Sequence, residues 1–242
     1  MKKILLSVAG LIAINAASAQ IKEGVIVYER KMNLHRRITD QQIKAMMPEF
    51  RTSKHQLLFC DSTSIYKAAP EDNVPDPFAS GQGGGIVMRM GGGENAQQYR
   101  NYSEAKAVES MEFGAKTYLI EDTIKAYGWK LTGETSTFLN YPVKKATRQT
   151  EKGQIIEAWY TESIPSPAGP ESFANLPGVI LKVNINNGET VYTAISVTEK
   201  VNRNDIKEPK KGKRIGRAEF MKMMQESMTT PGAGGNRVIR VG

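Results

Sequence analysis

The sequence predicts a mainly β protein: a curved antiparallel sheet, or half-barrel, with one or two short helices. Segments rich in Val, Ile, Tyr and Thr recur along most of the 242-residue chain, and these residue types suit strands. Apolar and polar residues alternate within several of them, as on a half-buried strand. Turn-forming residues separate them, most clearly Asn186-Asn187-Gly188, whose members tolerate the positive φ of tight hairpins.

One short helix is expected among the first strands. Asp40 can cap its first turn, residues 41–47 can form it, and Pro48 ends it. Strands are expected at residues 24–34, 54–60 and 62–67.

Residues 70–96 interrupt this pattern because they combine prolines with runs of glycine. Such a stretch buries too little apolar surface to offset the entropy lost on ordering, so we interpret it as a flexible excursion. A glycine-rich phosphate loop is the alternative, but the Gly-Lys-Ser/Thr ending of that motif is missing.

The strand pattern returns after this excursion. Within residues 154–160, Ile156, Ala158 and Tyr160 share one face, whereas Trp159 lies on the other. Strands are expected at residues 97–102, 116–121, 124–131, 143–149, 154–160, 179–185 and 190–200. A fully covered sheet with one curved face resembles, by analogy alone, the half-barrel of periplasmic lipoprotein carriers.

The C-terminal part differs in composition. A basic loop is expected at residues 210–214, followed by a helix at 217–228. Its apolar stripe of Phe220, Met221, Met224 and Met228 could dock on the sheet. A Gly-rich, disordered tail is expected from Pro231. The predicted division is therefore a β-rich domain over residues 20–207 and a loop, helix and tail over 208–242.

The first 19 residues have the pattern of a signal peptide. Lys2 and Lys3 precede a short apolar run, and small residues lead to a cleavage site between Ala19 and Gln20. The run is too short for a comfortable membrane span, and no later segment is long and apolar enough to cross a bilayer. We expect a periplasmic or secreted protein with no transmembrane segment after cleavage.

A proline- and glycine-rich segment leads into the strand at 179–185. It contains the hexapeptide Asn175, Leu176, Pro177, Gly178, Val179, Ile180. This segment resembles the signature of the GLPGLI family of secreted Bacteroidota proteins, from which it departs at Asn175 and Val179.

Upstream segments strengthen the resemblance. Residues 129–134 are similar to a Trp–Leu–Glu segment of the family, and residues 140–147 to a Gly-Tyr-x-Cys-x-Lys-Ala segment. In the second, Asn140 replaces Gly and Val143 replaces Cys, which argues against a thiol chemistry shared by the family. The resemblance implies secretion and a β-rich fold, with no activity or catalytic residue to carry over.

Charge and residue content disfavour several functional classes. The net charge is +8, but no nucleic-acid-binding motif is present, so solvated lysines or an anionic envelope surface explain it better. Cys60 is the only cysteine, so no intrachain disulfide can form; it reads as a small buried residue, with an intermolecular bridge as the alternative. His55 lies five residues from Cys60, on the opposite strand face, which disfavours a Cys–His pair.

No carboxylate pair or zinc motif stands out, and we expect no cofactor. The acidic residues Glu104, Glu109, Glu121 and Asp122 read as solvated turn residues. The sequence lacks the Gly-x-Ser-x-Gly elbow of one hydrolase class.

Aromatic residues indicate a function more clearly than the charged residues, the cysteine or the histidines. They either fill the core or line an apolar groove on the concave face that binds a protein partner or apolar ligand in the envelope. An outer-membrane transporter is the first partner to consider, on grounds of compartment. One alternative is a copper-binding protein using Met88 and Met90, and another is an unrecognised hydrolase. The aromatic candidates are Trp129, Tyr141, Trp159, Tyr160 and Phe173.

Overall fold

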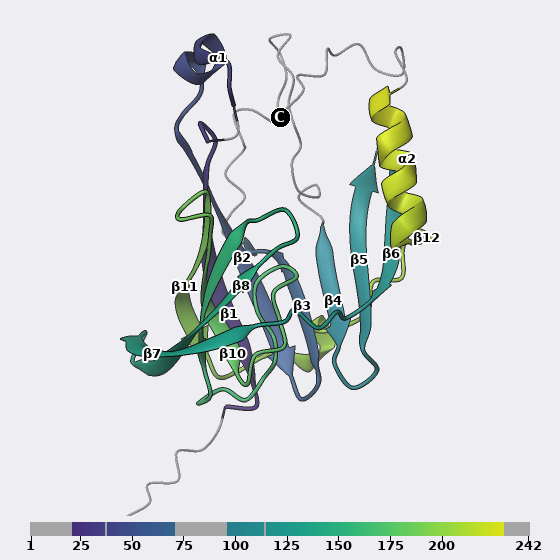
Figure 1. Cartoon of the computed structure of the whole chain (residues 1–242). Coiled ribbons are helices and arrows are strands. Elements are labelled where there is room, and N and C mark those ends of the chain that lie inside the picture. Colours follow the sequence, from purple (N-terminus) through teal and green to yellow (C-terminus); the bar gives the residue numbers. More distant parts are fainter. Residues whose placement is uncertain (1–20, 37, 71–95, 114, 230–242) are drawn as a thin grey trace, which may run out of the picture.

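Twelve strands of the described chain form one open, curved sheet (Figure 1). The computed structural model describes residues 21–36, 38–70, 96–113 and 115–229. The strands are β1 (Glu23–Asn33), β2 (Phe50–Cys60), β3 (Thr63–Ala68), β4 (Gln97–Asn101), β5 (Lys106–Phe113), β6 (Lys116–Thr123), β7 (Lys130–Phe138), β8 (Tyr141–Gln149), β9 (Ile155–Thr161), β10 (Val179–Ile185), β11 (Thr190–Thr198) and β12 (Lys213–Gly216).

The strand order across the sheet is β12-β6-β5-β4-β3-β2-β1-β11-β10-β9-β8-β7. Neighbouring strands are antiparallel, apart from the parallel pair β12 and β6. The predicted mainly β, curved sheet is therefore confirmed. Most connections are hairpins, but β6 and β7 lie near opposite edges, so the segment between them must cross from one side of the molecule to the other.

Alternation located several strands correctly. The predicted strand at 179–185 matches β10, and the assignment of Ile156, Ala158 and Tyr160 to one buried face of β9 is confirmed. The predicted strand at 124–131 is wrong, because only its last two residues belong to β7. β5 was missed. Lys213 and Arg214, assigned to a basic loop, lie in β12 instead.

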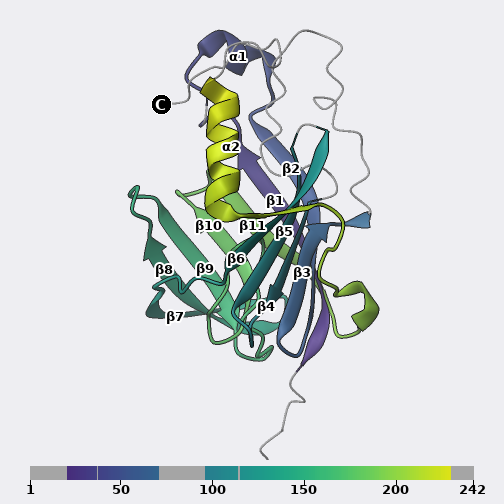
Figure 2. The same cartoon turned by 90° about the vertical axis from the view of Figure 1, so that its right-hand side faces the viewer.

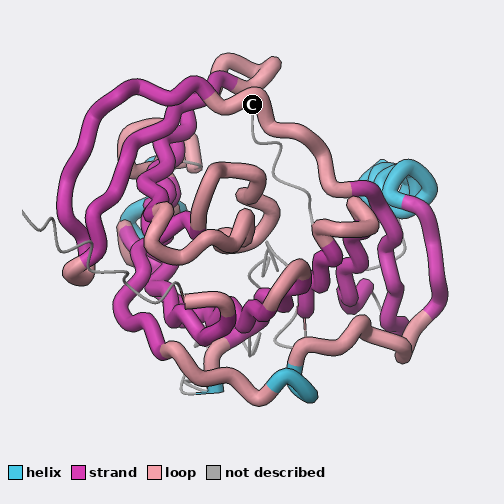
Figure 3. Tube along the Cα trace, turned by 90° about the horizontal axis from the view of Figure 1, so that it is seen from below, coloured by secondary structure: helices cyan, strands magenta, loops and turns pink. Residues whose placement is uncertain are grey.

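The main core lies on the inner face of the curved sheet, against the loop between β9 and β10 (residues 162–178). Figure 3 shows loop segments inside the space that the sheet encloses. The β9–β10 loop buries Ile164, Phe173 and Leu176 in the same apolar cluster as Tyr28 of β1. The hydroxyl of Tyr28 donates a hydrogen bond to the carbonyl oxygen of Ile180, 2.6 Å away. The chain therefore fills the middle of the concave side with its own residues.

A second apolar cluster lies on the opposite, outer face of β2 to β6. Residues 199–212, which include the 3-10 helix η2 (Arg203–Asp205), connect β11 in the middle of the sheet to β12 at one edge. Ile206 of this connection packs against Leu58 and Cys60. Cys60 is 8% exposed, so the prediction of a buried thiol is confirmed.

Two helices complete the described part of the chain. In α1 (Gln41–Met46), the carboxylate of Asp40 accepts hydrogen bonds from the backbone N–H groups of residues 42 and 43, which confirms the predicted cap. The helix α2 (Arg217–Thr229) lies beside β6 and β12 (Figure 2). Phe220 is 2% exposed, whereas Met221 is 56% exposed, so the expected apolar stripe is only partly buried.

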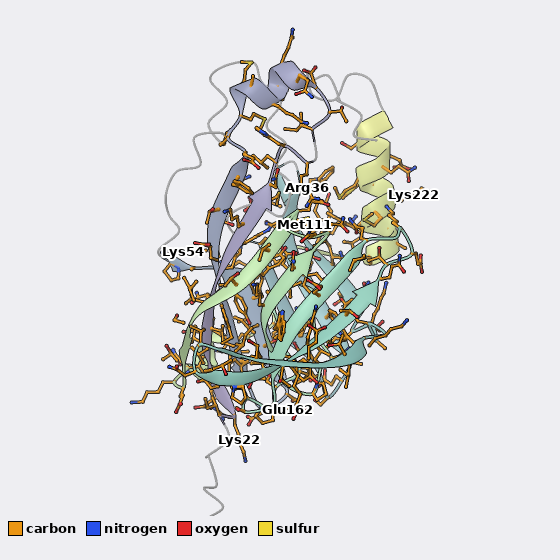
Figure 4. The ribbon with its side chains drawn as sticks, turned by 60° about the vertical axis from the view of Figure 1, so that its left-hand side comes forward. Lys22, Arg36, Lys54, Met111, Glu162 and Lys222 are labelled. Atoms are coloured by element: carbon orange, nitrogen blue, oxygen red, sulfur yellow. The ribbon has the colours of Figure 1, made fainter. Side chains whose placement is uncertain are left out.

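Arg217 connects the first turn of α2 to the inner face of the sheet through two ion pairs. Arg217 donates to Glu109 of β5 at 2.7 Å and to Asp122 of β6 at 3.1 Å. The interpretation of Glu109, Glu121 and Asp122 as solvated turn residues is therefore wrong, since all three lie in strands and form ion pairs with arginines. Figure 4 shows Lys222 on α2 pointing away from the strands.

Several predictions fall outside the described residues. These are the signal peptide at 1–19 with its cleavage site at Ala19 and Gln20, nearly all of the excursion at 70–96, the methionines Met88 and Met90, and the tail after Pro231. Neither described helix has the length and apolar character needed to cross a membrane.

Candidate functional site

Two segments far apart in the sequence meet on the inner side of the sheet. Residues 124–129, here called the crossing segment, connect β6 to β7 and contact the β9–β10 loop. The indole Nε1 of Trp129 donates to the carbonyl oxygen of Ala174 at 2.9 Å. In return, the side-chain amide of Asn175 donates to the carbonyl oxygen of Lys125, also at 2.9 Å. These reciprocal bonds fix the tip of the loop against the crossing segment.

The hexapeptide gives the loop its shape. Asn175 has a φ of +67°, in the left-handed region that Asn tolerates better than most residues. Pro177 fixes its own φ and restricts the residue before it. A Cβ at Gly178 would overlap the carbonyl oxygen of Thr161, so the backbone can pass β9 this closely only with glycine. The chain then enters β10 with Val179 fully buried.

A shallow pocket of about 280 Å³ opens where the crossing segment, β7 and the loop meet. Its walls are largely aromatic and aliphatic, and Tyr127 and Trp129 lie with ring centroids 6.5 Å apart. The guanidinium of Arg148 lies 4.6 Å from the centroid of the Tyr127 ring. Leu131 is 60% exposed, so solvent reaches this wall. The lining residues are Ala126, Tyr127, Gly128, Trp129, Leu131, Asn175, Leu176 and Pro177.

Only one of the five predicted aromatic residues lines this pocket. Trp129 does so, whereas Tyr160 and Phe173 are 1% and 7% exposed and belong to the main core. Trp159 alternates with the buried residues of β9 and faces the other side of the sheet, where the ammonium of Lys145 lies 5.9 Å from its ring. The two tryptophans therefore do not line a common groove.

Tyr141 begins β8, immediately after the β7–β8 turn, and is partly buried against the main core. Burial raises the pKa of Tyr141 and of Tyr160, so both hydroxyls stay protonated at neutral pH. Neither residue faces the pocket. The structure separates the sequence candidates into core residues, one outer-face tryptophan and one pocket residue.

Tyr127 and Leu131 are among the pocket residues that sequence reasoning missed. Both fell inside the predicted strand at 124–131, where they read as ordinary strand residues. The pocket needs the β9–β10 loop as its second wall, and that loop lies about fifty residues further along the chain. Proximity of this kind leaves no local pattern, although the Trp, Tyr and Leu within residues 127–131 were a usable compositional signal.

Metal ligation has little support in the described part of the chain. Within those ranges, no group of three or more His, Cys, Asp or Glu residues is placed to hold a metal ion. The pocket itself offers aromatic rings, aliphatic side chains and backbone groups, which are suited to binding an apolar group.

One family match covers the loop that forms a wall of the pocket. Residues 147–182, which include β9 and the whole β9–β10 loop, match a family described as "Protein of unknown function (Porph_ging)". No curated protein matches the chain.

Two solved structures of PNGF-II resemble the fold. The structure in space group P21 aligns with a TM-score of 0.58 and 15% identity, over 86% of this chain and 34% of that chain. The structure in space group C2 gives 0.58 and 16%, over 85% and 33%. The chain thus spans about a third of the length of PNGF-II. At this level of identity, the likeness concerns the fold alone.

Proposed function

We propose that this protein is a non-catalytic binding protein of the cell envelope, and that the pocket beside Trp129 receives an apolar side chain of a protein partner. The observation that carries this proposal is the pocket itself. It is bordered by the matched family segment and by the exposed side chain of Leu131. An apolar pocket with an exposed wall is a favourable anchor site for a partner side chain.

The size of the pocket favours a side chain over a lipid. Sites for whole small molecules commonly have about 300–1,000 Å³ and enclose most of the ligand. The pocket here has about 280 Å³, and the middle of the concave side is filled by Ile164, Phe173 and Leu176. An apolar ligand carried inside the sheet therefore has less support than a single anchoring group.

The neighbouring strand suits a partner in extended conformation. β7 is the last strand of the sheet order, and eight of its nine residues are exposed. An extended segment can add to such an edge through main-chain hydrogen bonds, while a nearby pocket selects one side chain. Because Leu131 belongs to both β7 and the pocket wall, the two features can act on one bound segment.

The cell envelope is proposed from the sequence. The first 19 residues have the pattern of a signal peptide, and the resemblance to the GLPGLI family implies secretion. Asn140 and Asn175, which replace family glycines, both have positive φ, at +64° and +67°. Asn is a conservative replacement for Gly at such positions, which supports the resemblance. An outer-membrane transporter is the first partner class to test.

Site-specific photo-crosslinking tests this function. A photoreactive amino acid replaces Leu131 in one variant and Ile155 in the other, because these side chains are 60% and 56% exposed and Ile155 is not in the pocket. Irradiation of native envelope should trap one discrete partner from position 131 and not from position 155. The crosslink should weaken when Trp129→Ala is added. Equal trapping from both positions, or none from position 131, contradicts the proposal.

A further inference from the structure

A group of polar side chains lies on the inner face of the sheet, on strands that do not border the pocket. We call it the Arg30 cluster: Arg30, His55, Tyr66, Glu171 and Tyr192. Arg30 of β1 pairs in register with Tyr192 of β11. His55 of β2 and Tyr66 of β3 lie on the other side of β1, and Glu171 approaches from the β9–β10 loop.

The Arg30 cluster consists of two contacting groups, one around Arg30 and one formed by His55 and Tyr66. Arg30 Nε lies 3.6 Å from Glu171 Oε1, and the guanidinium carbon lies 5.7 Å from the centroid of the Tyr192 ring. The rings of His55 and Tyr66 stack, with centroids 5.2 Å apart and planes 6° apart. Tyr66 is 3% exposed and Tyr192 is 1% exposed. A cationic and several polar side chains are therefore held in the interior of the molecule.

Three buried atoms of this cluster have no hydrogen-bond partner among the described residues: Arg30 Nε, His55 Nδ1 and the Tyr66 hydroxyl. Leaving a buried polar group unpaired costs about 1–3 kcal/mol, so such groups are rare and call for an explanation. Burial raises the pKa of Tyr66 far above its ordinary value, and Arg30 is a permanent cation. Two of the three atoms, Arg30 Nε and the Tyr66 hydroxyl oxygen, are therefore fixed hydrogen-bond donors that each lack an acceptor among the described residues.

The existing acceptor, Glu171, accepts a hydrogen bond from the Tyr192 hydroxyl but none from Arg30 Nε. Its carboxylate oxygen lies 3.6 Å from Arg30 Nε, which is beyond hydrogen-bonding distance. Its φ is +47°, a left-handed conformation that costs a residue such as Glu about 1 kcal/mol or more. Its side chain is 29% exposed, so the carboxylate can move toward solvent.

We propose that the Arg30 cluster is a binding site for a ligand with a free carboxylate, which accepts hydrogen bonds from Arg30 Nε and from the Tyr66 hydroxyl. In the free protein, the carboxylate of Glu171 occupies the solvent-facing side of the site in place of the ligand carboxylate. The ligand displaces it into solvent and takes over the charge of Arg30. Binding is an exchange of one carboxylate for another, with no covalent step.

The charges around the site make this proposal specific. Burial raises the pKa of both Tyr66 and Tyr192; the nearby charge of Glu171 raises each further, and that of Arg30 lowers each. A ligand carboxylate must compete with the negative charge of Glu171 for the one guanidinium. Removing the charge of Glu171 should therefore strengthen binding of the ligand carboxylate. A neutral polar ligand does not compete for the guanidinium charge, so its binding should not become stronger.

The site is tested by binding three carboxylate probes to the whole chain. The NMR signals of the His and Tyr rings report the binding. Acetate presents the bare group, hexanoate adds an apolar tail, and glycylglycine presents a peptide C-terminus. The probe that binds tighter than acetate identifies the source of the ligand, and equal binding of all three indicates recognition of the carboxylate alone.

Two variants give opposite expected results. Glu171→Gln should bind acetate at least five-fold tighter than the wild type, because the competing charge is gone. Tyr66→Phe, which removes only a hydroxyl, should bind at least five-fold weaker.

Lys31→Gln is the charge control, since Lys31 is exposed on the same strand but on the other face, and its affinity should equal that of the wild type. The proposal is overturned if no probe shifts the His55 and Tyr66 signals in Glu171→Gln. It is also overturned if Glu171→Gln binds no tighter than the wild type.

Discussion

The side-chain amide of Asn175 donates a hydrogen bond to the backbone carbonyl oxygen of Lys125, 2.9 Å away. It joins the tip of the β9–β10 loop to the crossing segment, fifty residues earlier in the sequence. The same residue has a φ of +67°, so one side chain both tolerates the turn and closes one wall of the pocket.

Replacing Asn175 should separate its two roles. Asn175→Gly keeps the left-handed backbone but loses the amide, so we expect a loss of about 0.5–1 kcal/mol of unfolding free energy. Asn175→Ala also strains the backbone and should lose about 1.5–2 kcal/mol in total. Urea unfolding at pH 7 measures both. If the alanine variant is as stable as the glycine variant, the backbone at residue 175 does not need the left-handed conformation.

Gly178 should tolerate no side chain. Its Cβ would overlap the carbonyl oxygen of Thr161, which belongs to β9 and cannot move without breaking the sheet. Gly178→Ala should therefore lose more than about 2 kcal/mol of unfolding free energy, as in other cases of overpacking and backbone strain. Gly153→Ala is the control, because its φ of +80° is strained but its surroundings are open. Its loss should be smaller, near 1 kcal/mol. Equal losses for the two variants would contradict the close approach of loop and strand.

The attachment of α2 should depend on Arg217. Removing its guanidinium leaves Glu109, whose side chain is 16% exposed, without its ion-pair partner and next to Asp122. Arg217→Ala should lower the unfolding free energy by about 2 kcal/mol and speed amide hydrogen exchange within α2. Arg214→Ala is the matched control, since Arg214 is 50% exposed and pairs with Glu121 and Glu208.

Arg214→Ala should lose less than about 1 kcal/mol of unfolding free energy, and amide hydrogen exchange within α2 should stay unchanged. If amide hydrogen exchange within α2 is the same in the wild type, Arg217→Ala and Arg214→Ala, then Phe220 and its apolar neighbours hold the helix without Arg217.

His55 should make the protein less stable in acid. Burial, together with the nearby charge of Arg30, lowers the pKa of His55 from 6.5 to about 4. The unfolded chain therefore binds a proton between pH 6.5 and pH 4 that the folded chain does not, so stability falls as the pH decreases through this range. Between pH 7 and pH 5 the loss from this residue should be on the order of 2 kcal/mol.

His55→Phe keeps an aromatic ring against Tyr66 and removes the titration. Comparing the urea midpoints of both proteins at pH 7 and pH 5 isolates the contribution of His55, because the other titrating groups are shared. The wild type should lose more stability than the variant. An equal loss in both would show that His55 gains its proton as readily in the folded protein as in the unfolded chain.

Local pattern was sufficient where strands alternate strongly. Val179 to Ile185 and Ile155 to Thr161 were found in this way, because alternation and β-branched residues both point to strands there. β5 was missed because its sequence, Lys-Ala-Val-Glu-Ser-Met-Glu-Phe, has mixed propensity, and its pairing with β4 and β6 decides its conformation. The Ile, Tyr and Trp of the crossing segment suit a strand, although Tyr127 and Trp129 lie against the β9–β10 loop instead.

The two sites differ in how far sequence could predict them. The pocket depends on contacts between residues 124–131 and 174–177, which no local period encodes. The Arg30 cluster has a sequence signal. Arg30 has the same strand parity as Ile26 and Tyr28, both fully buried, so a charged residue on that face of β1 already indicated an unusual position.

The most direct test of the proposed function is the affinity of the partner trapped at position 131 for three versions of the protein: wild type, Leu131→Asp and Ile155→Asp. Both aspartates replace exposed apolar side chains, at 60% and 56%, and only the first enters the pocket. The dissociation constant should rise at least ten-fold for Leu131→Asp and stay within two-fold for Ile155→Asp. Equal changes in the two variants, or none in either, would contradict a binding role for the pocket beside Trp129.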